Sequence, residues 1–160
     1  MPDFVADFRV SFDVPTLVQH LNTVDPLALV IRAHLYVEAA LIRMIEAAML
    51  KKEALDVAKI QFRTKLRLAI ALGKLDARHE PAIAALNTLR NRFAHNLASQ
   101  LNERDELNLY NSLSDEPSLL ADSLRKADLP FLTRLRCDVM AIIMQSEAAA
   151  QGKPLGRVLE

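Results

Sequence analysis

The fold is decided by residues 25–52, which read DPLALVIRAHLYVEAALIRMIEAAMLKK. Asp25 can accept hydrogen bonds from the N–H groups of a first helical turn, and Pro26 suits the first helical position. Residues at three- and four-residue spacing then predict one buried face: Val30, His34, Val37, Leu41, Ile45 and Ala48. Glu38 falls on or beside this face. Because charged or titratable side chains recur along the stretch, it is not a membrane span.

The chain beyond this stretch is also helical in pattern. We expect further helices at about residues 54–72, 81–99, 103–110 and 130–149, with Gly73 as the C-terminal cap of the first. Only three glycines occur in 160 residues, which argues against a hairpin-rich β fold and a Gly-rich phosphate loop. The sequence therefore predicts an all-α fold, a bundle of four to five helices.

Three parts of the chain differ in pattern. Residues 1–24 form an N-terminal arm whose apolar residues partly alternate; it is either an arm or a short helix packed on the body, and a strand would have no obvious partner. Residues 25–150 are the helical domain. Residues 151–160, after the last apolar stripe, are expected to be a flexible C-terminal tail.

The composition excludes several classes of protein. Twenty basic residues and twenty acidic residues cancel, so the whole chain is neither a highly basic nucleic-acid coat nor an acidic disordered protein. The single cysteine, Cys137, excludes an internal disulfide and a Cys-rich zinc site. His20 and His79 are expected at the surface, and the histidines have no metal-ligand spacing. We expect a cytoplasmic protein with no membrane contact, no cofactor and no metal.

Charge is divided unevenly along the chain. Residues 51–78 hold eight Lys or Arg against three Asp or Glu, whereas residues 101–122 hold six acids and one Arg. The basic segment is either a solvated face or a groove that follows a phosphate backbone, in which case Arg63 and Arg67 bind the substrate. The two segments could also meet in a self-pair or in a complex with a protein partner.

The most informative polar string is LRNRFAHN, residues 89–96. Asn91 and His95 are four residues apart, about 40° around a helix, so they share a face. Arg90 and His95 are about 140° apart, so one straight helix cannot easily aim both at one atom. Two copies of the string could do so across a dimer.

Arg90, Asn91 and His95 match a known motif. The string resembles that of the HEPN superfamily, an Arg followed after four to six residues by a His, often with Asn after the Arg. KLRLAIALGKLD followed by LNTLRNRFAHN is similar to compact bacterial members, including the mannitol operon repressor group. The resemblance covers about residues 25–100 and implies a HEPN-like bundle.

The resemblance implies a metal-independent endoribonuclease, toxin- or defence-related, that acts as a homodimer and uses the RNA 2′-OH as nucleophile. His95 can then act as general base or acid, and Arg90 can bind the scissile phosphate. Asn91 orients His95 or donates to phosphate, and Glu38 fixes the imidazole or balances Arg90. Arg92 is a further candidate for substrate binding. A cognate antitoxin is a possible partner.

A second interpretation stays open, in which Arg90 pairs with Glu38 and His95 caps helix-end carbonyls, in purely structural roles. The protein is then a non-catalytic regulator or protein-binding module, similar to the mannitol operon repressor group and active through a regulated protein. Exposure of Arg90 and His95 in a cleft favours the nuclease, and burial against Glu38 favours the binding module.

Overall fold

The computed structural model describes residues 11–96, 98–114, 122 and 127–152, and within these residues all regular structure is helical. Three short 3₁₀ turns join longer α-helices. The α-helices are α1 (Val14–Leu21), α2 (Pro26–Ala48), α3 (Phe62–Ala71), α4 (Glu80–His95), α5 (Glu103–Asn111) and α7 (Phe131–Ala150); the 3₁₀ turns are η1 (Lys52–Ala54), η2 (Val57–Lys59) and η3 (Ala77–His79). The predicted all-α bundle is confirmed, although the described residues contain six α-helices where four to five were expected.

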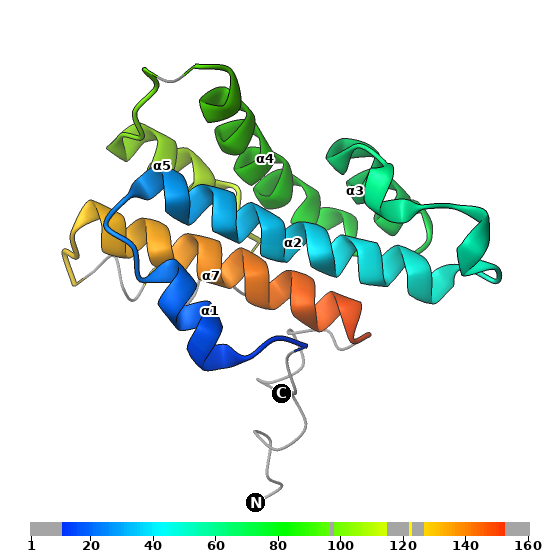
Figure 1. The fold of residues 1–160 in the computed structure, drawn as a ribbon. Helices are drawn as coiled ribbons and strands as arrows, with labels where there is room; N and C mark the ends of the chain where they lie inside the picture. The colour runs from blue at the N-terminus through cyan, green and yellow to red at the C-terminus, as the bar shows by residue number, and fades with distance from the viewer. Residues whose placement is uncertain (1–10, 97, 115–121, 123–126, 153–160) are drawn as a thin grey trace, which may run out of the picture.

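Helix α2 is the centre of the bundle (Figure 1). It packs along α7 on one side and against α3 and α4 on the other, and it also contacts α1. Its buried face is aliphatic apart from one histidine, which agrees with the predicted stripe: Leu29, Val30, Ala33, His34, Val37, Ala40, Leu41, Met44 and Ile45. Burial of this stripe is what holds α3, α4 and α7 around α2.

The predicted helix ends are confirmed where they depend on caps. The Asp25 carboxylate accepts from the backbone N–H of Leu27 at 2.9 Å, and Pro26 is the first residue of α2. At the end of α3, Gly73 has a φ of 67°, a left-handed conformation that glycine adopts without strain. The N–H of Lys74 then bonds to the carbonyl of Ala69 at 2.9 Å and closes the helix.

Between Ala48 and Phe62 the structure corrects the sequence prediction. We expected helix to about residue 52 and again from 54, but α2 ends at Ala48 and α3 begins at Phe62. The segment between them is extended and contains only η1 and η2. It takes this path because Val57 is buried in the core, at 1% exposure, and the carbonyl of Ala58 accepts from the Lys65 ammonium at 3.0 Å. A continued helix could not place both groups there.

The N-terminal segment forms a short helix on the body, one of the two predicted alternatives. Leu17 and Leu21 of α1 are buried in the main core. Ser11 donates through its backbone N–H and its hydroxyl to the buried Glu147 carboxylate of α7. Residues 1–10 and 153–160 lie outside the described part of the chain.

Glu147 joins three parts of the fold. Its carboxylate is bound by Arg43 of α2 and also accepts from Gln151 at 2.9 Å. These donors outweigh the opposing effect of burial and lower the pKa of Glu147 to about 2. The carboxylate therefore stays ionised and fixes the start of the described chain to α2 and α7.

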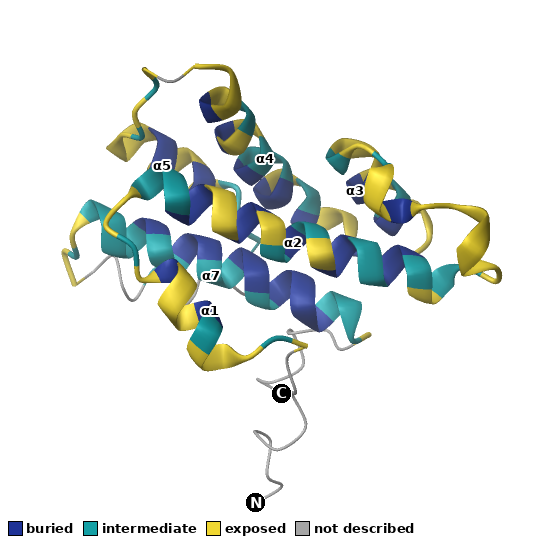
Figure 2. Ribbon diagram, viewed as in Figure 1, coloured by how far each residue is buried: buried dark blue, intermediate teal, exposed yellow. Residues whose placement is uncertain are grey.

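Figure 2 shows exposed residues along α1 and α2, and several of them are aliphatic. Val14 and Val18 on α1 are 48% and 52% exposed, and Ile31 and Leu35 on α2 are 41% and 58% exposed. Each pair has four-residue spacing, so its two members lie on the same side of their helix. Among the described residues, no helix combines the length and the apolar character needed to cross a membrane.

Candidate functional site

The motif residues lie on the last turns of α4. The inner side of this helix is fixed by Leu86, Leu89 and Phe93, all buried. The polar residues between them face outward as a consequence of helical spacing: Arg90 and His95 are exposed, and Asn91 is half-buried. We call Arg90, Asn91 and His95 the motif cluster.

Two members of the motif cluster are joined directly. The Arg90 guanidinium donates through Nη1 to the side-chain oxygen of Asn91 at 3.1 Å. His95 is the last residue of α4 and follows Asn91 by one turn on nearly the same side of the helix. The amide of Asn91 is therefore positioned to orient the arginine, whereas the sequence analysis assigned it to His95 or to phosphate.

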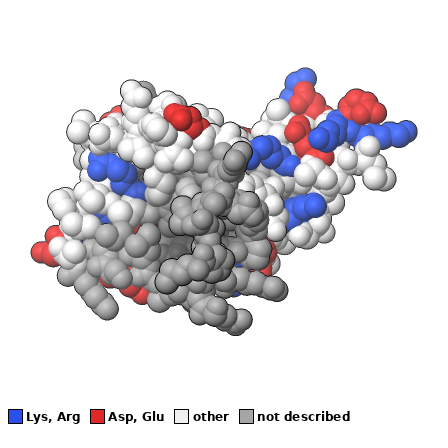
Figure 3. All heavy atoms as spheres, turned by 90° about the horizontal axis from the view of Figure 1, so that it is seen from below, with Lys and Arg blue, Asp and Glu red and all other residues white. Residues whose placement is uncertain are grey.

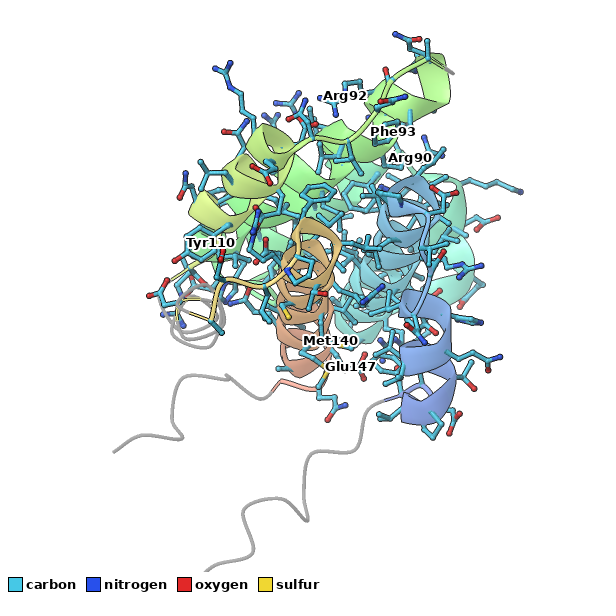
Figure 4. The ribbon with its side chains drawn as sticks, turned by 90° about the vertical axis from the view of Figure 1, so that its left-hand side faces the viewer. Arg90, Arg92, Phe93, Tyr110, Met140 and Glu147 are labelled. Carbon is cyan, nitrogen blue, oxygen red and sulfur yellow. The ribbon has the colours of Figure 1, made fainter. Side chains whose placement is uncertain are left out.

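Arg92 points away from the motif cluster. Its two terminal nitrogens donate to the two carboxylate oxygens of Asp105 on α5, each at 2.7 Å, and its guanidinium lies 5.3 Å from the centre of the Phe93 ring. Figure 4 shows Arg90, Arg92 and Phe93 together on this end of α4. The Arg92 hydrogen bonds lower the pKa of Asp105. Arg92, expected to bind substrate, is thus held by an internal ion pair.

Asp105 was missed by the sequence analysis, although a local signal was present. Asn102 and Asp105 have the three-residue spacing of a capping box. In the structure each side chain accepts from the backbone N–H of the other, at 3.0 and 3.1 Å. This spacing predicts the start of α5, but it does not show which arginine the carboxylate binds.

Glu38 lies apart from the motif cluster. It is half-buried on α2 and accepts from the Lys65 ammonium of α3 at 2.6 Å. Within the described residues, none of the recorded hydrogen bonds or ion pairs links it to Arg90 or His95. The predicted contacts of Glu38 with the imidazole of His95 and with Arg90 are absent from this structure.

His34 forms the centre of a second polar group, between α2, α3 and α4. Its Nε2–H donates to the side-chain oxygen of Asn87 on α4 at 3.0 Å, and its ring lies 4.1 Å from the ring of Phe62, centre to centre. Only 5% of His34 is exposed. We call this group the His34 cluster; its residues are His34, Glu38, Phe62, Lys65 and Asn87.

The surroundings of His34 disfavour its protonation. Burial lowers the pKa of His34, and the positive charges of Arg90 and Lys65 act in the same direction. The hydrogen bond to Asn87 and the negative charge of Glu38 oppose this shift without cancelling it. Since Arg90 contributes to the pKa of His34, the two clusters are close enough to interact electrostatically.

Arg63 and Arg67 are exposed on the outer face of α3, as a substrate-binding role requires. The basic segment as a whole is less uniform than its sequence suggests. Figure 3 shows both signs of charge at the end of the molecule formed by η1 and η2, and Lys59 there pairs with Asp56 at 3.0 Å. A track for phosphate would therefore involve α3 and not these turns.

Part of the acidic segment, residues 101–122, forms ion pairs within the chain. Asp105 binds Arg92, and the adjacent Glu106 is buried and lies 3.4 Å from Arg134 of α7. These carboxylates are not exposed to a partner. This weakens the sequence hypothesis that the basic and acidic segments meet across a complex.

His20 and His79, two histidines outside the motif cluster, were both expected at the surface, but only one of them is exposed. His20 is exposed on α1, as expected, and its Nδ1 lies 2.9 Å from the Tyr36 hydroxyl. His79 was expected at the surface but is only 7% exposed. Its Nδ1 lies 3.1 Å from the Ser114 hydroxyl, which also accepts from Gln145 at 2.8 Å. The sequence did not indicate this burial, because His79 was expected near a helix end or in a loop and its partner Ser114 is distant in sequence.

The described part of the chain contains no group of three or more His, Cys, Asp or Glu side chains placed to hold a metal ion. No family model, curated protein or solved structure matches this chain. The motif cluster presents a guanidinium, an amide and an imidazole to solvent on one helix end, which are groups able to bind a phosphodiester and to transfer a proton.

Proposed function

We propose that this protein is a metal-independent endoribonuclease of HEPN type. The observation that carries the proposal is the exposure of Arg90 and His95 on the last turns of α4, with Arg90 held by Asn91 at 3.1 Å. Neither residue is paired with Glu38, which binds Lys65 instead.

The residue types fit the cleavage of a phosphodiester by its own 2′-OH. His95 takes the proton from the 2′-OH, whose oxygen attacks phosphorus while the bond to the 5′-oxygen breaks. The products are a 2′,3′-cyclic phosphate and a 5′-OH, whose oxygen takes its proton from water. Arg90 binds the non-bridging oxygens and offsets the charge that develops on them. Asn91 holds the Arg90 guanidinium, and the exposed Arg63 and Arg67 bind flanking phosphates.

Helical geometry supports a homodimer as the active form. Arg90 and His95 are about 140° apart around α4, so one protomer presents them in different directions. A two-fold pair of α4 helices brings the Arg90 of one protomer toward the His95 of its partner. The exposed Ile31 and Leu35 of α2 supply apolar area for such a contact.

The test is incubation of the purified protein with mixed RNA in excess EDTA. We expect cleavage by the wild type and a loss of at least about 100-fold in His95→Ala and in Arg90→Ala. His20→Ala is the matched control, because it removes another exposed histidine and leaves α4 intact. Equal cleavage by His95→Ala and the wild type would refute the proposal, as would cleavage that requires a divalent metal.

A second candidate is a binding module or regulator without turnover. It is favoured by the exposed aliphatic pairs Val14 with Val18 on α1 and Ile31 with Leu35 on α2, which offer apolar area to a partner. This function predicts no RNA cleavage at any protein concentration. It also predicts that Val18→Ser with Leu35→Ser abolishes self-association or partner binding in light scattering, without loss of helix content.

A further inference from the structure

The carboxylate of Asp105 holds two helices at once. It accepts both terminal nitrogens of Arg92 on α4 at 2.7 Å and the backbone N–H of Asn102 at 3.0 Å. The Asp105 side chain is 10% exposed and that of Arg92 is 39% exposed, so the carboxylate is enclosed while the arginine remains partly open to water. A bidentate pair of this kind fixes the orientation of the arginine as well as its distance.

Helix α5 is itself fixed to the bundle. Leu109 is fully buried, and Glu106, next to Asp105, lies 3.4 Å from Arg134 of α7. Arg134 also donates to the carbonyl of Leu129 at 2.8 Å. Helix α5, which carries Asp105, is therefore held in position by α7. Through its pair with Arg92, Asp105 links the position of α5 to that of α4.

The end of α4 depends on this connection. His95 is the last helical residue, and Asn96 after it is already extended. Within the last turn, the side chains that contact the body are Phe93, which is 5% exposed, and Arg92. Burial of Phe93 holds the last turn of α4 against the core. The pair of Arg92 with Asp105 fixes the rotation of this turn about the helix axis, because Arg92 lies beside Phe93 on the side away from Arg90.

We propose that Asp105 is a positioning residue for the motif cluster: through Arg92 it orients the last turn of α4 and thereby His95. This inference rests on the proposed function, which makes His95 a proton-transfer group. It assigns Arg92 to the support of the site and removes it from the residues that bind RNA. A small rotation of a helix end is enough to move an imidazole out of reach of a 2′-OH.

The experiment compares Asp105→Asn with Asn102→Ala in the full-length chain. Asparagine at 105 can still accept from the N–H of Asn102, so the cap survives while the charge pair with Arg92 is lost. Asn102→Ala removes the cap bond to the N–H of Asp105 and keeps the carboxylate for Arg92. We expect Asp105→Asn to lower kcat at least about tenfold with KM within twofold, and Asn102→Ala to leave kcat within twofold.

Three results would overturn the inference. A lower KM in Asp105→Asn would mean that the released Arg92 binds RNA phosphate. Equal losses of kcat in the two variants, in proportion to their losses of Tm, would mean that Asp105 only stabilises α5. Independent effects of Asp105→Asn and Arg92→Gln, adding in the double variant, would mean that the pair does not act as one unit.

Amide hydrogen exchange tests the positioning role of Asp105 independently of RNA cleavage. We expect Asp105→Asn to speed amide exchange at least about fivefold in residues 92–96, and Asn102→Ala to leave this segment unchanged. If the wild type does not cleave RNA, the proposed function fails, and exchange still decides whether Asp105 holds the last turn of α4. Unchanged exchange in Asp105→Asn would refute the positioning role by itself.

Discussion

The His34 cluster and the motif cluster both lie against α4, yet they use polar side chains in opposite ways. In the His34 cluster, a buried imidazole and a buried ammonium each have a partner, Asn87 and Glu38, inside the bundle. In the motif cluster, an imidazole and a guanidinium lie at the surface. Residue type does not separate the two groups. What separates them is burial: His34 and Lys65 are enclosed in the bundle with their partners, whereas Arg90 and His95 are open to solvent.

The largest effect on stability is expected at Lys65. It is 1% exposed, and its ammonium binds the Glu38 carboxylate at 2.6 Å and the carbonyl of Ala58 at 3.0 Å. Lys65→Ala should lower the free energy of unfolding by about 3 kcal/mol, because it opens a cavity and leaves both acceptors unpaired.

Urea unfolding of Lys65→Ala should be compared with that of Lys59→Ala. Lys59 is an exposed lysine paired with Asp56, so its loss should cost less than about 0.5 kcal/mol. Similar midpoints for the two variants would show that the His34 cluster does not depend on its charge pair. Lys65→Met should recover part of the loss, since it refills the volume.

The next largest effect contrasts two histidines. His34→Ala removes the ring packed on Phe62 and the bond to Asn87, and should lower the free energy of unfolding by about 2 kcal/mol. His95→Ala should change it by less than about 0.5 kcal/mol, because His95 is exposed. Thermal unfolding of both variants measures this difference, and a large loss in His95→Ala would place that residue among the structural ones.

The pH dependence of stability should carry a contribution from His34. In the unfolded chain the pKa of His34 is near the ordinary histidine value of about 6.5, and burial lowers this pKa in the folded protein. As pH falls below about 7, the unfolded chain takes up a proton that the folded chain resists, so the free energy of unfolding decreases until the pH reaches the folded pKa. The decrease is at most about 1.4 kcal/mol per pH unit.

Thermal unfolding at pH 7.5 and pH 5.5 isolates this contribution when the wild type is compared with His34→Gln. Glutamine can still donate to Asn87 but does not titrate, so the variant should lose less stability on acidification than the wild type. Arg90→Gln should reduce the acid sensitivity, because the positive charge of Arg90 helps to lower the pKa of His34. If the stability of the wild type and of His34→Gln depended on pH in the same way, the contribution assigned to His34 would be contradicted.

The smallest effect on stability is expected at Asn91. Its side-chain oxygen accepts from Arg90 at 3.1 Å near the surface. Asn91→Ala should change the free energy of unfolding by less than about 0.5 kcal/mol, yet lower RNA cleavage about tenfold by releasing the Arg90 guanidinium. Cleavage by Asn91→Ala at the wild-type rate would show that Arg90 needs no such support.

The sequence by itself determined the helices and most of their ends. The start of α2 at Asp25 and Pro26, the cap of α3 at Gly73 and the apolar stripe of α2 are all local features of the sequence. These features were predictable because neighbours in sequence decide them.

The tertiary structure decided which partner each polar side chain takes. Glu38 binds Lys65, 27 residues away, and Arg92 binds Asp105, 13 residues away. The same dependence on distant groups explains the burial of His79 and the extended path of residues 49–61 around Val57. Helical periodicity shows which face of a helix is apolar. Two charged side chains on different helices can pair only when the helices are packed at a particular rotation and height. The packing of the whole core sets that arrangement.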